Sequence, residues 1–437
     1  MKKTFHIFSL FIAVFSSCLI SAQDGGLNTL VTFHRNLLNP AFQSKHKVEI
    51  GLGSVLFNFG SENISFDDMF TKSGEGVYYF DGDKTLEKLD DQNNVDANAY
   101  LGLIDLHMNF GKFSLCTGYG LRTNARLTYT DDLVALMVNG NAPYIGQTLD
   151  VGTKFSVQTF NQIYVGGSYD IGRIQLGAKL KFVGGVQHIS TNRSDVSLLT
   201  DEEIYQLHLT TDIEIVSSGA LLYNGIDDVS LDLDPYYSFG NFFQNNQGLL
   251  FDVGVSGDIS DKWRAYGSIL DIGSISWNTK AYKYVSKKEQ SFVGIDLADY
   301  LTDGSVDDIS LKDTLYNLLD LERTPQSFTT KAGIDFHVGT DYDITERLNL
   351  GALYSNYGSS DLRTKAISIQ SRYRLGKAFD IGLNYTIRDK TYSNFGITTQ
   401  LHLGPFNAFL ATDSLPLSFK FTKARSISLR TGISLAF

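Results

Sequence analysis

The last twelve residues, 426–437, alternate between apolar side chains and small or polar ones. From Ile427 to Phe437 every odd position is apolar or Thr, and every even position is Ser, Arg, Gly or Ala. A period of two residues is typical of a β-strand whose two faces differ in polarity. Because a strand of about 9–11 residues can cross a bilayer at the usual tilt, we predict that this segment spans a membrane and ends at Phe437.

The same alternation recurs along the chain, in segments joined by short turns or by long polar connections. Examples are residues 113–122, 149–157, 174–182, 249–259, 365–375 and 393–403. The count is about 14–16 strands, in agreement with the even strand numbers of bacterial outer-membrane barrels. Many of the predicted strands reach roughly 10–13 residues, whereas strands of soluble sheets usually have about 5–6 residues.

The two faces of these strands differ in charge, because the charged side chains gather on the face opposite the apolar one. Charge is costly against lipid and tolerated in a barrel lumen. We therefore predict an all-β fold, a single transmembrane antiparallel β-barrel of about 14 strands over residues 48–437. A large soluble β-protein such as a propeller is the alternative. The residues expected to form a luminal charge network are Lys179, Lys181, Asp212, Glu214, Asp252, Arg264, Asp335, Arg372, Arg374 and Arg430.

Short turns and long connections divide the predicted barrel into two ends. An additional strand near 228–233 is needed to keep the turn at Gly172 on the same side as the turn at Asp261. Thr130 can cap a short helix at 130–139, and Gly140 follows its end. Short amphipathic helices are also expected within 297–321. The long connections expected to be external loops are 58–97, 187–203, 218–247 and 278–327.

The N-terminal residues 1–22 have the features of a secretory signal peptide. Lys2 and Lys3 precede an apolar stretch at 5–20, and small residues suited to cleavage follow. Together with the strands, this segment predicts a location in the bacterial outer membrane. A transmembrane anchor and a lipoprotein signal at Cys18 are the alternatives.

The composition argues against several function classes. The chain has 437 residues, two Cys and a formal net charge of −11, which argues against a nucleic-acid partner. Once Cys18 leaves with the signal peptide, Cys116 alone can form neither an intramolecular disulfide nor a Cys-based metal site. The mean hydropathy of −0.09 resembles that of a soluble protein, as expected when only one face of each strand is apolar.

Candidate catalytic and metal-binding residues are sparse. No local nucleophile motif stands out, and the acidic residues at 81–96 lack the spacing of an EF-hand loop. We therefore expect a protein that is not an enzyme and has no cofactor. Trp263 and Trp277 bracket one predicted strand, at positions suited either to interfacial aromatic girdles or to packing within the fold. Four His residues point to the lumen by strand parity: His107, His208, His337 and His402.

The triplet Asn39-Pro40-Ala41, just before the first strand, resembles the N-terminal motif of FadL-type outer-membrane proteins. That superfamily includes fatty-acid transporters and the PorV-like barrels of type IX secretion. Residues 129–133, followed by Gly140-Asn141, and residues 270–277 resemble a Bacteroidota barrel family with no assigned function. The resemblance covers nearly the whole mature chain and implies that residues 23–47 fold into the lumen as a hatch.

Two functions remain open. In the first, the barrel binds or passes a small amphipathic or hydrophobic solute. In the second, implied by the PorV resemblance, it is a non-catalytic accessory subunit of a type IX-like secretion or outer-membrane assembly complex. The expected partners are outer-membrane lipid, the barrel-assembly machinery through the C-terminal strand, and, in the second case, a secretion or surface-protein complex.

Overall fold

A computed structural model describes residues 25–74, 76–223, 229–232, 244–292, 319–358, 363–388, 391–415 and 421–437. The predicted signal peptide at 1–22 and most of the helical region predicted at 297–321 lie outside these residues.

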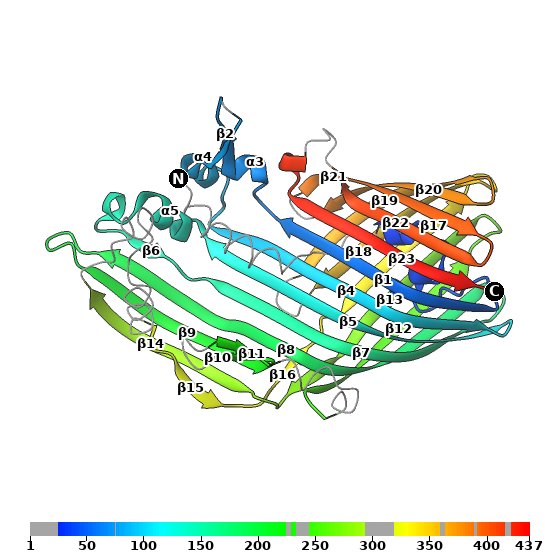
Figure 1. Ribbon diagram of the computed structural model, residues 1–437, viewed down its shortest axis with the longest axis horizontal. Helices are drawn as coiled ribbons and strands as arrows, with labels where there is room; N and C mark the ends of the chain where they lie inside the picture. The colour runs from blue at the N-terminus through cyan, green and yellow to red at the C-terminus, as the bar shows by residue number, and fades with distance from the viewer. Residues whose placement is uncertain are drawn as a thin grey trace.

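Fourteen strands form a closed antiparallel barrel (Figure 1). The last strand pairs with both its predecessor and the first strand, which closes the sheet. The predicted all-β barrel of about 14 strands is therefore confirmed. The wall strands are β1 (Val48–Ser61), β4 (Gln92–Asn109), β5 (Phe113–Thr130), β7 (Lys154–Asp170), β8 (Ile174–Thr200), β12 (Gln247–Asp258), β13 (Trp263–Trp277), β17 (Asp335–Asp343), β18 (Leu348–Gly358), β19 (Arg363–Leu375), β20 (Phe379–Arg388), β21 (Thr391–Leu403), β22 (Phe406–Leu415) and β23 (Ser426–Ala436).

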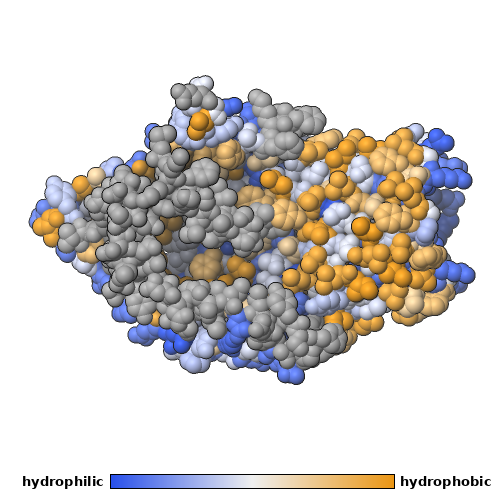
Figure 2. Space-filling view, in the orientation of Figure 1, coloured by the Kyte–Doolittle hydropathy of each residue, from blue (hydrophilic) through white to orange (hydrophobic). Residues whose placement is uncertain are grey.

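The wall is polar inside and apolar outside. On β23, Ser428 and Arg430 are buried, whereas Ile427 and Leu429 are 54% and 42% exposed. Figure 2 shows the resulting apolar surface over the half of the molecule that carries the short turns. This arrangement is the reverse of a soluble sheet, which buries its apolar face against a core.

The sixth wall strand is broken in two. β9 (Leu207–Gly219) pairs with the second half of β8, and β12 pairs with the first half. Between them, β10 (Leu221–Tyr223) and β11 (Val229–Leu231) pair only with each other. The additional wall strand predicted near 228–233 is therefore wrong, because β9 and β12 run in the same direction and together supply the missing crossing.

Asn246 bridges the break between β9 and β12. Its Oδ1 accepts hydrogen bonds from the backbone N–H groups of Asn278 and Thr279, both at 2.9 Å. Its Nδ2 donates to the Gly185 carbonyl at 3.3 Å. The buried amide therefore replaces ladder bonds where the regular pairing stops.

The wall continues beyond the barrel on the side of the long connections. There β8, β9, β14 (Tyr282–Phe292) and β15 (Glu322–Pro325) pair side by side (Figure 1). The loop predicted at 187–203 is therefore wrong, since β8 is 27 residues long and continues to Thr200. The loop predicted at 278–327 likewise contains β14 and β15.

Short elements lie in the connections. The predicted helix is confirmed as α5 (Asp131–Asn139), where Thr130 Oγ1 accepts from the Leu133 N–H at 3.3 Å. None of the helices in the described ranges has the length and hydropathy that a transmembrane helix requires. The remaining elements outside the N-terminal segment are α3 (Phe66–Met69), β2 (Phe70–Lys72), β3 (Tyr78–Phe80), α4 (Gly82–Leu86), η2 (Ala142–Tyr144), β6 (Thr148–Asp150), β16 (Phe328–Lys331) and η3 (Phe421–Lys423).

The two Trp residues mark the ends of β13, as predicted, but differ in environment. Trp263 is 45% exposed, and its Nε1 donates to Thr340 Oγ1 at 2.7 Å. Trp277 is fully buried and packs in an apolar cluster with Phe160 and Leu250. The interfacial position predicted for Trp277 is therefore wrong, and the packing alternative describes it.

Candidate functional site

Residues 25–47 lie inside the barrel at the end that carries the short turns, and we call them the hatch. They contain two short helices, α2 (Gly25–Asn28) and η1 (Phe33–Leu37), which Figure 1 shows behind β22 and β23. Most of their side chains are buried. The hatch meets the wall at two separate places, which differ in the kind of contact they make.

The Asn39-Pro40-Ala41 motif forms the first place of contact. Asn39 Nδ2 donates to the backbone carbonyls of Val255 and Gly267, each at 3.0 Å. Asn39 Oδ1 accepts from the Ala41 N–H at 2.8 Å. One side chain therefore links the hatch to two adjacent wall strands, β12 and β13.

A pair of glycines makes room for this motif. Gly177 of β8 and Gly254 of β12 lie opposite each other in the ladder. A Cβ on Gly177 would overlap the backbone of Pro40 and Ala41, and one on Gly254 would overlap the Asn39 amide. The motif thus occupies a recess that any larger residue in the wall would fill.

The α2 end of the hatch forms the second place of contact, through wall side chains. The Gly26 N–H donates to Asp413 Oδ1 at 2.7 Å. Gln400 accepts from the Val31 N–H at 2.8 Å and donates to the Thr29 carbonyl at 3.1 Å. These wall groups satisfy backbone groups that the short helix leaves unpaired.

Arg35 connects the two ends of the hatch to the wall. Its guanidinium pairs with Asp341 of β17 at 2.7 Å and donates to Asn28 Oδ1 at 2.9 Å. It also lies 4.3 Å from the ring centre of Phe42, within cation–π range. Arg35 therefore ties α2 and the segment after the motif to one carboxylate of the wall.

His34 of the hatch is buried between aromatic rings. Its ring centre lies 4.0 Å from that of Phe33 and 4.7 Å from that of Phe409. Burial lowers the pKa of His34 to about 3, because the imidazolium would lose its hydration. The docked hatch therefore holds a neutral imidazole.

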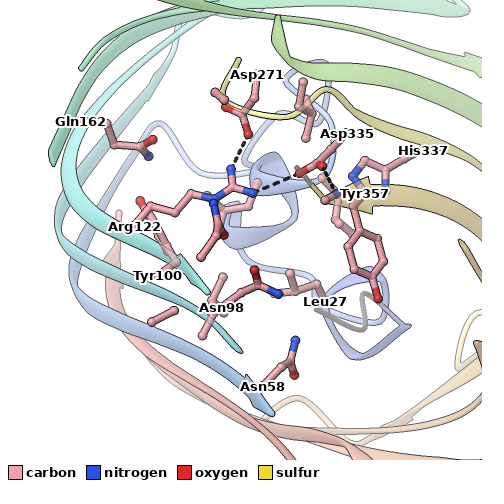
Figure 3. Close-up of a pocket in the computed structure, with 18 of the residues that line it drawn as sticks. Leu27, Asn58, Asn98, Tyr100, Arg122, Gln162, Asp271, Asp335, His337 and Tyr357 are labelled. Atoms are coloured by element: carbon pink, nitrogen blue, oxygen red, sulfur yellow. Dashed lines mark hydrogen bonds and ion pairs between the residues drawn. The ribbon is translucent and has the colours of Figure 1, made fainter. Parts of the chain in front are cut away.

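The hatch separates two cavities. The upper cavity, toward the long connections, has a volume of about 140 Å³ and is bordered by Leu27 and Leu38 of the hatch (Figure 3). The lower cavity, about 390 Å³, lies at the short turns and is bordered by Arg35 and Phe42 from the opposite side of the hatch. The hatch is thus the partition between the two halves of the lumen.

Five charged wall residues meet near the upper cavity, and we call them the charge cluster: Arg122, Lys181, Asp252, Asp271 and Asp335. Figure 3 shows Arg122 between Asp271 and Asp335, to which it is ion-paired. Lys181 Nζ lies 2.6 Å from Asp271 and 2.8 Å from Asp252. The cluster cross-links five wall strands, and removing one member of such a buried set typically costs about 3–5 kcal/mol.

Two members of the cluster, Arg122 and Asp271, were not among the predicted network residues. Arg122 follows the inward parity of β5, so the alternation alone could have identified it. Asp271 could not be found in this way, because its neighbour Leu270 is the inward residue. Its φ is +59°, and the register shifts there because β13 has one extra residue opposite Asp252 of β12, which turns the Asp271 side chain inward.

The other predicted network residues fall into separate groups. Arg430 pairs with Asp413 at 2.6 Å, and Lys179 Nζ donates to the Asn36 carbonyl of the hatch at 2.8 Å. Near the short turns, Arg264 pairs with Asp258, Arg374 pairs with Asp380, and Arg372 borders the lower cavity.

Asp212 and Glu214 are the exceptions to the predicted network. They lie on the sheet extension, where they pair with Arg193 at 2.6 Å and Lys283 at 2.8 Å. Their place in a luminal network is therefore wrong. The reason is that β9 continues past the barrel, so the same strand parity no longer points into a lumen.

The four His residues that strand parity predicted to face the lumen lie in different environments. His107 and His337 are buried in the wall interior, His402 lies 3.1 Å from Asp380, and His208 contacts Ser291 on the exposed extension. Within the described residues no group of His, Cys, Asp and Glu side chains is arranged to hold a metal ion.

Phe437 pairs through its backbone with Val48 at the seam of the barrel. Its role as an assembly signal stays a prediction.

Comparison with known proteins gives loose structural likenesses. No curated protein matches the chain. The toluene transporter TbuX of Ralstonia pickettii is 9% identical, with a TM-score of 0.42 and 92% of each chain covered. A FadL homologue of Pseudomonas aeruginosa is 10% identical, with a TM-score of 0.40 over 96% of this chain and 98% of that one.

A family match covers most of the sequence. Residues 40–413 match the Family of unknown function (DUF5723). This range begins within the Asn39-Pro40-Ala41 motif and ends in β22, so it includes most of the barrel wall. The chain therefore belongs to the DUF5723 family, whose function is not known.

Proposed function

We propose that the protein is an outer-membrane channel for small amphipathic solutes, in which the hatch gates passage between the two cavities. One observation carries this proposal: different residues of the hatch border an upper cavity of about 140 Å³ and a lower one of about 390 Å³. A barrel that served only as a scaffold would have no need of cavities on both sides of a separately docked segment.

The outer surface supports a membrane location. Large apolar side chains such as Ile367, Ile369 and Leu410 are 53%, 63% and 54% exposed around the barrel. Figure 2 shows a broad apolar surface on the visible face of the barrel, whereas monomeric soluble proteins rarely expose patches above a few hundred Å². Lipid is the partner that such a closed belt fits.

Cross-linking the hatch to the wall tests the gating directly. A Cβ on Gly26 would lie 3.3 Å from that of Ala411, near the separation found in disulfides, and 2.9 Å from Asp413 Oδ1, so the Asp413 side chain must shift slightly. We would introduce Gly26→Cys and Ala411→Cys in a Cys116→Ala background, reconstitute the protein in liposomes and follow benzamidine efflux. Benzamidine carries an amidinium that stays almost wholly protonated at neutral pH, so it crosses bare lipid slowly.

We expect the oxidised protein to release benzamidine no faster than protein-free liposomes, and the reduced protein to release it at least as fast as the Cys116→Ala parent. Equal release in the oxidised and reduced states would overturn the gating role. Release at the protein-free rate by the parent itself would overturn the channel proposal.

The alternative role, as an accessory subunit of a secretion or assembly complex, rests on the PorV resemblance. No contact among the described residues favours it over the channel.

A further inference from the structure

We propose that the upper cavity selects solutes that carry a hydrogen-bond donor, a hydroxyl or an amine, on an apolar body about the size of one aromatic ring. The inference rests on the proposed function, because it names the class of solute that the channel admits. It follows from the unpaired acceptor, the paired cations, the apolar floor and the size of the cavity.

An amide oxygen in the cavity wall awaits a donor. Asn58 Oδ1 is buried and lacks a hydrogen-bond partner among the described residues. Gln162 Oε1 is also buried, but the Tyr100 hydroxyl lies beside the Gln162 side chain and can donate to it. Both side chains border the upper cavity, and each residue is 4% exposed. An unpaired buried acceptor is costly, so a solute that brings a donor to it is favoured over one that does not.

Asn58 is part of a row of amides across the wall. It lies opposite Asn98 of β4, which lies opposite Asn124 of β5. Directly opposed residues of antiparallel strands share a face, and all three border the cavity. Figure 3 shows Asn58 and Asn98 facing the same space as Leu27 of the hatch. The row offers a second amide to any solute that reaches Asn58.

The charges around the cavity disfavour an anionic solute. The cations Arg122, Lys181 and Arg430 are each already paired with carboxylates. Of their carboxylate partners, Asp271 and Asp335 border the cavity, whereas Asp252 and Asp413 lie outside its lining. An added carboxylate would have to displace an existing partner of one of these cations and would face the Asn58 amide oxygen. An ammonium or hydroxyl can donate to that oxygen instead.

The floor of the cavity is apolar, and its volume limits the solute. Leu27 and Leu38 of the hatch and Leu56 of β1 border it. Its volume of about 140 Å³ is close to the roughly 150 Å³ of an apolar cavity known to bind benzene. One ring fits with its apolar body on the hatch and its donor toward Asn58, so the bound solute contacts the gate itself.

Four probes of the same ring size test the selection. Benzyl alcohol and benzylamine carry a donor, toluene has none, and benzoate is an anion with acceptors only. Binding to the full-length mature protein in nanodiscs would be measured by calorimetry, with empty nanodiscs subtracting partition into lipid. We expect each donor probe to bind about tenfold or more tighter than toluene, and benzoate not to bind.

Matched variants locate the effect. Asn58→Leu removes the unpaired acceptor at similar side-chain size, so the advantage of benzyl alcohol over toluene should fall about tenfold. Gln162→Leu should reduce that advantage less, because the Tyr100 hydroxyl already lies beside the Gln162 side chain. Thr117→Val is the control, since Thr117 lies on the outer face of β5 and bonds only the wall. If one of these two variants fails to fold, the donor selectivity is still tested by the ranking of probes on the wild type and by the other variant.

Toluene binding as tightly as benzyl alcohol, or an unchanged ratio in both acceptor variants, would overturn the inference. These outcomes are separate from those of the efflux experiment. Selective binding without efflux would leave the donor site standing and reject the channel. Efflux of benzamidine without selective binding would reject the donor site alone.

Discussion

The two ends of the hatch are held to the wall in different ways. At Asn39-Pro40-Ala41 the hatch backbone lies directly against the backbone of β8 and β12, in the space left by Gly177 and Gly254. At α2, three backbone groups of the hatch are held by the side chains of Gln400 and Asp413.

This difference in contact indicates that the Asn39-Pro40-Ala41 motif, and not α2, is the anchored end of the hatch. A backbone seated in a close-fitting recess cannot shift by a fraction of an ångström without losing its contacts. Hydrogen bonds from side chains can be exchanged for bonds to water at a small net cost, about 1 kcal/mol each. We therefore expect the hatch to open from α2 while the motif stays in place.

The largest effect is expected from filling the recess. Gly177→Ala places a Cβ on the backbone of Pro40 and Ala41, which should weaken docking by about 3 kcal/mol, the upper end of the usual cost of overpacking. Single-channel conductance in planar bilayers should rise well above wild type. Gly257→Ala on β12 is the control, because the nearest atom lies 3.9 Å away. A Gly177→Ala barrel with wild-type conductance would show that the motif is not the anchor.

Removing the link between the two ends should have the next largest effect. Arg35→Met keeps the apolar contact with Phe42 but leaves Asp341 without its cation. We expect docking to weaken by about 2–3 kcal/mol, somewhat less than for a fully buried pair. Trypsin should cleave the hatch at Lys45 faster. Arg35→Met combined with Asp341→Leu should recover much of the loss, and no recovery would point to the Asn28 contact instead.

Loosening only the α2 end should have a smaller and local effect. Gln400→Leu leaves the Val31 N–H and the Thr29 carbonyl unpaired, at about 1 kcal/mol each. Amide hydrogen exchange at Val31 should speed up about thirtyfold, while exchange at Ala41 stays unchanged. The neighbouring outward residue supplies the control, Thr399→Val. Equal acceleration at Val31 and Ala41 would mean that the two ends release together.

The smallest effect is expected from pH. The pKa of His34 is about 3 when the hatch is docked and near 6.5 when the side chain is in water. Docking therefore releases a proton, so its free energy is complete above the free value and declines as the pH falls toward the docked value. At pH 5.5 the loss is about 1.4 kcal/mol. Hatch proteolysis should speed up about tenfold between pH 7.5 and 5.5, and His34→Gln should abolish this change.

The fold could be predicted to a large extent because its signals are local. The alternation in β23 is complete within eleven residues, and Thr130 and Gly140 delimit α5 without reference to the rest of the chain. The extension at 187–200 was predicted as a loop because the segment is polar. Pairing with β9, which follows directly after the turn at 201–206, makes it a strand.

The site could be predicted only in part. Lys181, Asp252 and Asp335 were identified by parity and do meet in the charge cluster, whereas Asp212 and Glu214 pair elsewhere. Parity tells which face a side chain occupies but not how far along the lumen axis it lies. It also fails at a register shift, where Asp271 turns inward.

The sequence by itself determined the face of each strand, the closure of an all-β barrel, the short helix and the presence of an Asn39-Pro40-Ala41 motif. The tertiary structure decided which charges pair, where the sixth wall strand breaks, and that the motif fits a recess formed by Gly177 and Gly254. The physical reason is the separation along the chain of the residues that interact. Alternation and capping depend on neighbours in the chain, whereas ion pairs, cavities and the hatch contact depend on strands brought together only when the barrel closes.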